Sequence, residues 1–151
     1  MKHLLLSALV AALVVVPLGC NDDEQEIQVS GSQERSRELS RHIEDLDASN
    51  PSVRRRAAEQ LGQMQAREPE AVEALGDALR DPDRGVRVSA AESLGKIGNL
   101  AALEELRDAS HQGYQEARQV YTNQTTVLHQ RARQGDAAAA NTLDRLGEQN
   151  P

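Results

Sequence analysis

Apolar residues in the middle of the chain recur at intervals of three and four residues, the spacing of one helix face. Two long stripes show the pattern: Val53, Ala57, Leu61 and Met64 in one, and Val86, Ala90, Leu94 and Ile97 in the other. A shorter stripe precedes each of them, over residues 39–46 and 72–79. The pattern therefore predicts successive pairs of helices, each helix with one apolar face.

The two long stripes belong to two copies of one unit. A single shift of the sequence aligns VRRRAAEQLG (53–62) with VRVSAAESLG (86–95). Asn50 and Asp83 stand at matching positions under this shift, where a side-chain oxygen can cap the helix that follows. Similarity between two segments at one fixed spacing is typical of helical repeat arrays, in which each unit packs on the next. The sequence therefore predicts an all-α fold, a short α-solenoid.

Beyond residue 110 the repeat weakens, but the spacing stays helical. Tyr121 and Leu128 lie two helical turns apart in a stretch with helical periodicity. Asp136 can cap a last helix over residues 137–146. Terminal units of an array are atypical, because one of their faces meets water. We therefore interpret residues 110–151 as a degenerate repeat followed by a capping helix, after repeats over residues 34–109.

The two copies resemble HEAT repeats. The Val-Arg start, the Ala-Ala pair and the final Leu-Gly are closest to the short form called the PBS-lyase HEAT-like repeat, over about residues 46–108. The resemblance implies that the second helix of each pair lines a concave, ligand-facing surface. It also implies that Arg54 and Arg87 support the stacking of repeats, beside Asp47 and Asp81.

On this resemblance, one polar stripe per copy is the candidate partner surface. The stripes consist of Arg56, Glu59 and Gln63 in the first copy, and of Ser89, Glu92 and Lys96 in the second. Their mixed charge suits recognition of a protein, whose identity the sequence does not give. The alternative is a helix face that is merely solvated.

The N-terminus predicts export and lipid attachment. Lys2 precedes an apolar run, residues 4–16, that is too short to cross a bilayer comfortably. Leu18-Gly19-Cys20 then resembles a bacterial lipobox, and Cys20 is the only cysteine, so no disulfide partner exists. We expect residues 1–19 to be a signal peptide and residues 20–33 to be a lipidated Cys20 with a flexible acidic tether. The alternatives are ordinary signal-peptide cleavage and an uncleaved anchor.

Composition excludes several classes of function. The chain of 151 residues carries 24 acidic and 17 basic side chains and has two Tyr but no Phe or Trp. A net charge of −7 disfavours a nucleic-acid partner, and the lack of aromatic residues disfavours base stacking. Asp81 and Asp83 imitate the start of a calcium loop, but Gly85 stands where the third oxygen ligand belongs. We therefore expect a helix cap there, and no metal or cofactor.

These observations predict a non-enzymatic interaction or scaffold lipoprotein of the bacterial cell envelope. Its lipid would hold it on a membrane, facing the periplasm or the cell exterior, and no small-molecule substrate is expected. Two alternatives stay open. The family resemblance suggests an accessory subunit related to bilin lyases, and a repeat array also suits a structural subunit of a larger envelope assembly.

Overall fold

The computed structural model of the chain describes the backbone of residues 22–148 and the side chains of residues 31–148. Within this part the chain forms seven α-helices and no strand. Their bounds are α1 Asp22–Asp45, α2 Pro51–Gln63, α3 Pro69–Ala78, α4 Arg84–Ile97, α5 Leu100–His111, α6 Gln115–Arg133 and α7 Ala137–Leu146. The predicted all-α class is confirmed.

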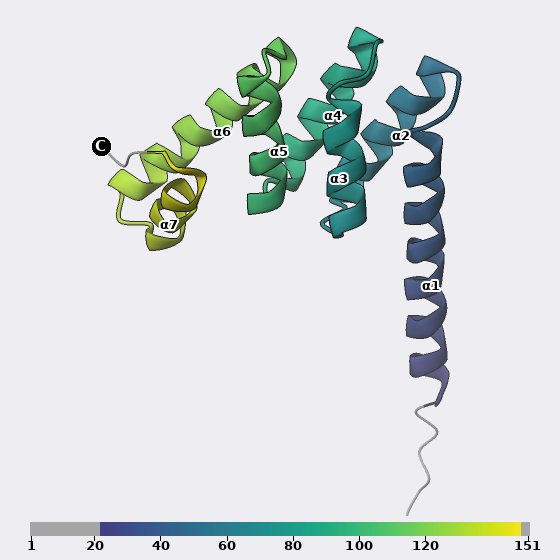
Figure 1. Cartoon of the computed structure of the whole chain (residues 1–151). Helices are drawn as coiled ribbons and strands as arrows, with labels where there is room; N and C mark the ends of the chain where they lie inside the picture. Colours follow the sequence, from purple (N-terminus) through teal and green to yellow (C-terminus); the bar gives the residue numbers. More distant parts are fainter. Residues whose placement is uncertain (1–21, 149–151) are drawn as a thin grey trace, which may run out of the picture.

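The first six helices form three pairs that stand side by side in two layers (Figure 1). We call α1, α3 and α5 the A layer, and α2, α4 and α6 the B layer. Each helix contacts its partner in the pair and the equivalent helix of the next pair. At the end of the stack, α7 packs against α5 and α6. This is the predicted short α-solenoid with a C-terminal capping helix.

Side-chain caps determine where most of these helices begin. Asn50, Asp83 and Asp136 each accept a hydrogen bond from a backbone N–H in the first turn of α2, α4 and α7. Such a cap satisfies one of the N–H groups that a helix leaves without a partner. All three predicted caps are confirmed, and Asn99 caps α5 in the same way.

The first helix begins earlier than the sequence predicts. Residues 22–33, expected to be a flexible tether, form the first half of α1. The physical reason is local: no proline interrupts α1, and Glu, Gln and Arg, which are good helix formers, are frequent in it. Leu39 and Ile43 pack the second half of α1 against the core. The tether prediction is thus corrected from Asp22 onward, whereas the expected signal peptide and Cys20 lie outside the described residues.

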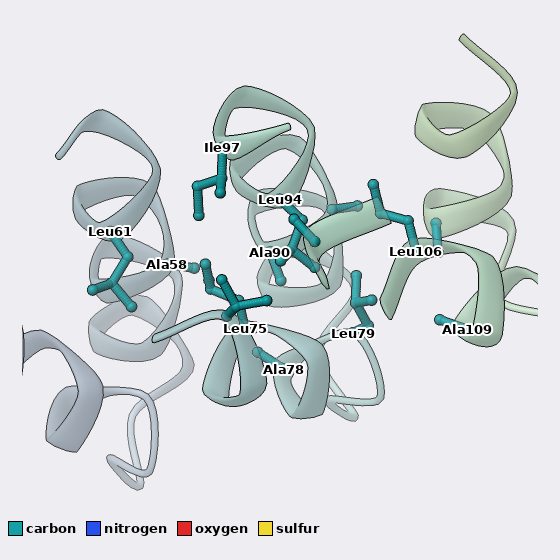
Figure 2. Packing of buried hydrophobic residues seen from close by; sticks show 14 of the residues in the cluster. Ala58, Leu61, Leu75, Ala78, Leu79, Ala90, Leu94, Ile97, Leu106 and Ala109 are labelled. Carbon is teal, nitrogen blue, oxygen red and sulfur yellow. The ribbon is translucent and has the colours of Figure 1, made fainter. Parts of the chain in front are cut away.

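Small and branched apolar side chains fill the space between the two layers (Figure 2). Leu61, Leu75, Leu94 and Leu106, from four successive helices, are completely buried. Alanines lie between them, which lets the helices approach closely without aromatic side chains. The cluster continues through α6 to α7. The core therefore has no break at residue 110, where the sequence suggests the boundary between regular and degenerate repeats.

Candidate functional site

Small residues determine how closely the B-layer helices approach one another. A Cβ added to Gly62 in α2 would lie 2.6 Å from the Cβ of Ser93 in α4. One added to Gly95 in α4 would lie 2.7 Å from Val120 Cγ1 in α6. Ser93 Oγ also donates a hydrogen bond of 2.8 Å to the carbonyl of Ala58, which joins α4 to α2. Close packing at these contacts fixes the B layer as one surface.

One arginine joins each repeat to the next, Arg54 at the first contact and Arg87 at the second. Arg54 in α2 donates to both carboxylate oxygens of Asp81, at 2.7 and 2.8 Å. Arg87 in α4 donates to Glu116 in α6 at 3.3 Å. Each arginine therefore pairs with an acid of the following repeat. The stacking role implied by the family resemblance is present, but Arg87 uses Glu116 in place of Asp81, and Asp47 has no ion pair among the described residues.

The same contacts favour the ionised form of both acids. The hydrogen bonds from Arg54 hold the pKa of Asp81 below its ordinary value. A backbone hydrogen bond lowers the pKa of Glu116, and hydrogen bonds from Arg87 and Arg84 lower it further. Charges on these side chains thus persist at neutral pH and are already partnered within the fold.

The six residues predicted as a partner surface do not all reach solvent. Arg56, Gln63, Glu92 and Lys96 are exposed, and Glu59 is half-buried. Ser89 is only 6% exposed, and its hydroxyl donates to Glu59 at 3.2 Å across the contact between α2 and α4. Ser89 is therefore part of the contact between repeats, because α4 has a preceding B-layer helix to pack against. The placement predicted for Ser89 on the open face is corrected.

The two edges of the B layer differ from its interior. Arg56 of α2 is exposed, whereas Ser89, at the equivalent position of α4, is buried. Aligning α6 with α4 places the exposed Thr126 where α4 has Gly95, and Thr122, one turn earlier, is exposed as well. Small residues therefore occur where a neighbouring helix packs, and larger polar residues occur at the edges.

A groove follows the contact between α4 and α6 on the open face of the B layer. Two adjoining hollows of about 270 and 460 Å³ form it. Glu92, Val120 and Asn123 line both of them. Val88 adds to the apolar floor of the first hollow, and Lys96 lines the second. Two of the predicted surface residues, Glu92 and Lys96, thus lie at the groove.

The α6 side of this groove is absent from the sequence prediction. The periodicity of this segment indicated a core stripe through Tyr121, which is buried, as is Ala117 one turn earlier. The groove residues Val120 and Asn123 lie beside that stripe. An alignment of α6 with α4 that matches Tyr121 to Ala90 is the signal that could have identified them.

A second, smaller hollow of about 190 Å³ lies between α1 and α3. Ile43 and Ala74 contribute its apolar lining, and Asp47, Asp77 and Asp81 contribute carboxylates. Asp81 is already held by its ion pair with α2. Among the side chains that the structure describes, no group of His, Cys, Asp and Glu could hold a metal ion. The larger groove of the B layer is therefore the candidate site.

Within residues 22–148, none of the helices combines the length and the apolar character that crossing a bilayer requires.

The array is similar to part of a known, larger protein. A HEAT repeat-containing taxis protein of Halobacterium salinarum is 42% identical to the chain over 71 residues. The aligned region is 46% of this chain and 18% of the relative, so the chain spans less than a fifth of that protein's length.

A family model for HEAT repeats matches residues 41–122, more than half of the 151 residues. This region begins in α1 and ends in α6, and so covers the stacked helix pairs. Repeats of this family commonly serve in protein interaction and as scaffolds. The matched region and the paired helices together establish that the chain belongs to the HEAT-repeat family.

Proposed function

We propose that the chain is a protein-interaction module that binds its partner in the groove between α4 and α6. The observation that carries the proposal is the groove itself, which has an apolar floor and a polar rim on the open face of a packed layer. Val88 and Val120 supply apolar surface, and Asn123 supplies amide hydrogen-bonding groups. An apolar centre within a polar rim is the arrangement of protein-protein interfaces.

The rigidity of the B layer supports this use of the groove. Ser93 and Gly95 hold α2, α4 and α6 in close contact, and the pair of Arg87 and Glu116 joins the two helices that form the groove. A surface that is already ordered loses little conformational entropy when a partner binds. The surface is therefore suited to recognition without rearrangement.

Site-specific photo-crosslinking in cells tests the proposal. A photoreactive residue at Asn123 should form an adduct with a partner, and the same residue at the exposed Glu73 of α3 should not. Val120→Arg, which fills the groove, should abolish the Asn123 adduct while the circular dichroism spectrum stays helical. Equal adducts from both positions, or none from Asn123, would contradict the proposed site.

Attachment to a bacterial membrane through Cys20 is part of the same proposal. The support is in the sequence: the apolar run of residues 4–16 is followed by Leu18-Gly19-Cys20, and the sequence has no second cysteine. Each acyl chain stabilises membrane binding by about 0.8 kcal/mol per buried methylene. Two or more chains on one protein therefore hold it durably on a membrane. Cys20→Ser should move the protein into the soluble fraction. Continued pelleting with membranes after an alkaline wash would refute lipid anchoring.

The relative suggests a second context for the same groove. The name of that larger protein connects it with taxis, and the part shared with this chain is a stretch of 71 residues. If this chain serves a taxis system, the partner cross-linked at Asn123 should be a component of one. Identification of the adduct by mass spectrometry distinguishes this context from an unrelated envelope partner.

A further inference from the structure

Charged residues are distributed unequally between the two layers. Helices α2, α4 and α6 carry nine basic and three acidic side chains. Counted from residue 31, α1, α3 and α5 carry four basic and ten acidic side chains. The overall charge of −7 therefore conceals a basic B layer and an acidic A layer.

Ion pairs within the fold leave positive charge free at the groove. At one end, the carboxylate of Glu116 is shared by Arg84 and Arg87, each at 3.3 Å. One acid cannot neutralise two guanidinium groups, and the Arg84 side chain is 80% exposed. Lys96 lines the second hollow and has no hydrogen bond or ion pair among the described residues. Glu92, four residues earlier, is likewise without a bonded partner there.

From this arrangement we infer that the groove receives an acidic, amphipathic segment of a partner protein. The inference rests on the proposed function and adds the chemistry of the partner. An apolar side chain of the segment packs on Val88 and Val120, while its carboxylates pair with Arg84 and Lys96. Complementary charge of this kind accelerates association and selects among partners. Of the two acids that line the groove, Glu116 is held in ion pairs and Glu92 is not. The carboxylate of Glu92 therefore repels the carboxylates of such a segment.

A protein segment fits the groove better than other anionic partners. Bases of nucleic acids bind by stacking on aromatic side chains, and the groove has none. Phosphate groups would pair with Arg84 and Lys96 but would leave the apolar floor of Val88 and Val120 uncovered. A bilayer surface is flat on the scale of the groove and does not enter it. A helical or extended peptide can place one apolar side chain between charged ones, as this groove requires.

Peptide binding to the full chain measures the sign of the preferred charge. The probes are two fluorescent peptides of equal length and equal leucine content, one containing glutamates and the other lysines. Fluorescence anisotropy should show binding of the glutamate peptide only. Binding should weaken about threefold or more between about 0.05 M and 0.5 M salt, because screening reduces attraction between exposed charges.

Two neighbouring variants give the sharpest form of the test. Glu92→Gln should strengthen binding of the glutamate peptide, and Lys96→Gln should weaken it, each by about two- to fivefold. Arg41→Gln, which removes an exposed cation from α1 in the A layer, should leave the affinity unchanged. Helical circular dichroism of all three variants separates loss of binding from loss of folding.

Several results would overturn the inference. They are tighter binding of the lysine peptide, binding of neither peptide, or weaker binding after Glu92→Gln. The inference also fails if phosphatidylglycerol vesicles or a single-stranded oligonucleotide bind the groove more tightly than the glutamate peptide, with the same sensitivity to Lys96→Gln. If crosslinking at Asn123 captures a protein through a basic segment, the inference is wrong and the proposed function stands. If Asn123 captures nothing, the proposed function itself fails.

Discussion

Arg54 and Asp81 meet through two parallel hydrogen bonds of 2.7 and 2.8 Å, although 27 residues separate them in the chain. The planar guanidinium group matches both oxygens of the carboxylate, which fixes direction as well as distance. A third hydrogen bond, of 2.8 Å, joins Arg54 to the carbonyl of Ala48 before α2. One side chain thus connects the turns that precede α2 and α4.

Asp81→Asn should lower the free energy of unfolding at neutral pH. It should also make that free energy change less as the pH falls into the acid range. The pKa of Asp81 is lowered in the fold, so its ionised form adds stability above the unfolded-state value of about 4. That contribution is lost as pH falls through the folded-state pKa. Urea unfolding at several pH values should show a difference between wild type and variant that is full at pH 7 and shrinks below about pH 4.

Asp77→Asn is the matched control, because the Asp77 side chain is 84% exposed and only 3.9 Å from Arg80 at its nearest. It should leave the pH profile of wild type unchanged. A constant difference between Asp81→Asn and wild type at every pH would show that the ion pair does not contribute through charge.

Exchanging residues between equivalent positions of the two copies should have unequal effects. Ser89→Arg places a cation in the contact between α2 and α4, where Ser89 is 6% exposed, and should lower the free energy of unfolding by about 2–4 kcal/mol. Arg56→Ser changes an exposed edge residue and should alter it by less than about 0.5 kcal/mol. Chemical denaturation measures both. Similar losses in the two variants would mean that the edge and the interior are not distinguished by packing.

Gln65→Gly should stabilise the protein. Gln65 has a φ of 50°, in the left-handed region, whereas the equivalent position of the next copy is Gly98, with a φ of 58°. Left-handed backbone costs a residue with a Cβ about 1–2 kcal/mol, part of which glycine returns as greater freedom of the unfolded chain. We expect a gain of about 0.5–1 kcal/mol in thermal or urea unfolding.

The control for this substitution is Gln60→Gly inside α2, which should lower stability by about 1 kcal/mol. A loss of stability in Gln65→Gly as well would indicate that the side chain of Gln65 matters more than its backbone angle.

Tyr121 should make the end of the array sensitive to alkaline pH. Its hydroxyl donates a hydrogen bond of 2.7 Å to Glu148, just after α7, and burial raises its pKa above the ordinary value. The neutral phenol therefore stabilises the fold below about pH 10, and this contribution is lost as pH rises further. Tyr121→Phe should lower the free energy of unfolding by about 1 kcal/mol at neutral pH.

Hydrogen exchange provides the local measurement for this prediction. Exchange in α7 should become faster in Tyr121→Phe, while α2 and α3 stay protected. Uniformly faster exchange across the chain would contradict a local role. Ultraviolet titration of Tyr114→Phe, which leaves Tyr121 as the only tyrosine, should show ionisation shifted to higher pH.

Features that depend on neighbours in sequence were predictable, and those that depend on neighbours in space were less so. Asn50, Asp83 and Asp136 act within one helical turn, so composition and spacing sufficed to place the caps. The burial of Ser89 depends on a helix 30 residues earlier, and the repeat pattern alone treats it like the exposed Arg56. The same applies to Glu116, which becomes the partner of Arg87 only once α6 packs beside α4.

The start of α1 required a different distinction. Polar, acidic residues suggest a tether, but the same residues are good helix formers when no proline intervenes. Composition alone does not separate a solvated helix from a coil in that segment. The sequence predicted only the α4 side of the groove. The repeat pattern identified Glu92 and Lys96 but not Val120 of α6.

The two edges of the B layer differ from its interior, and this difference constrains how such an array can change its length. A unit added before α2 would have to cover the guanidinium of Arg56, and a unit added after α6 would meet Thr122 and Thr126 in place of small residues. A duplicate of α3 and α4 inserted in the middle would instead present serines to one neighbour and glycine to the other, as α4 does now. Duplication of an inner unit should therefore lengthen the described array with a smaller loss of stability than addition of a unit at either of these edges.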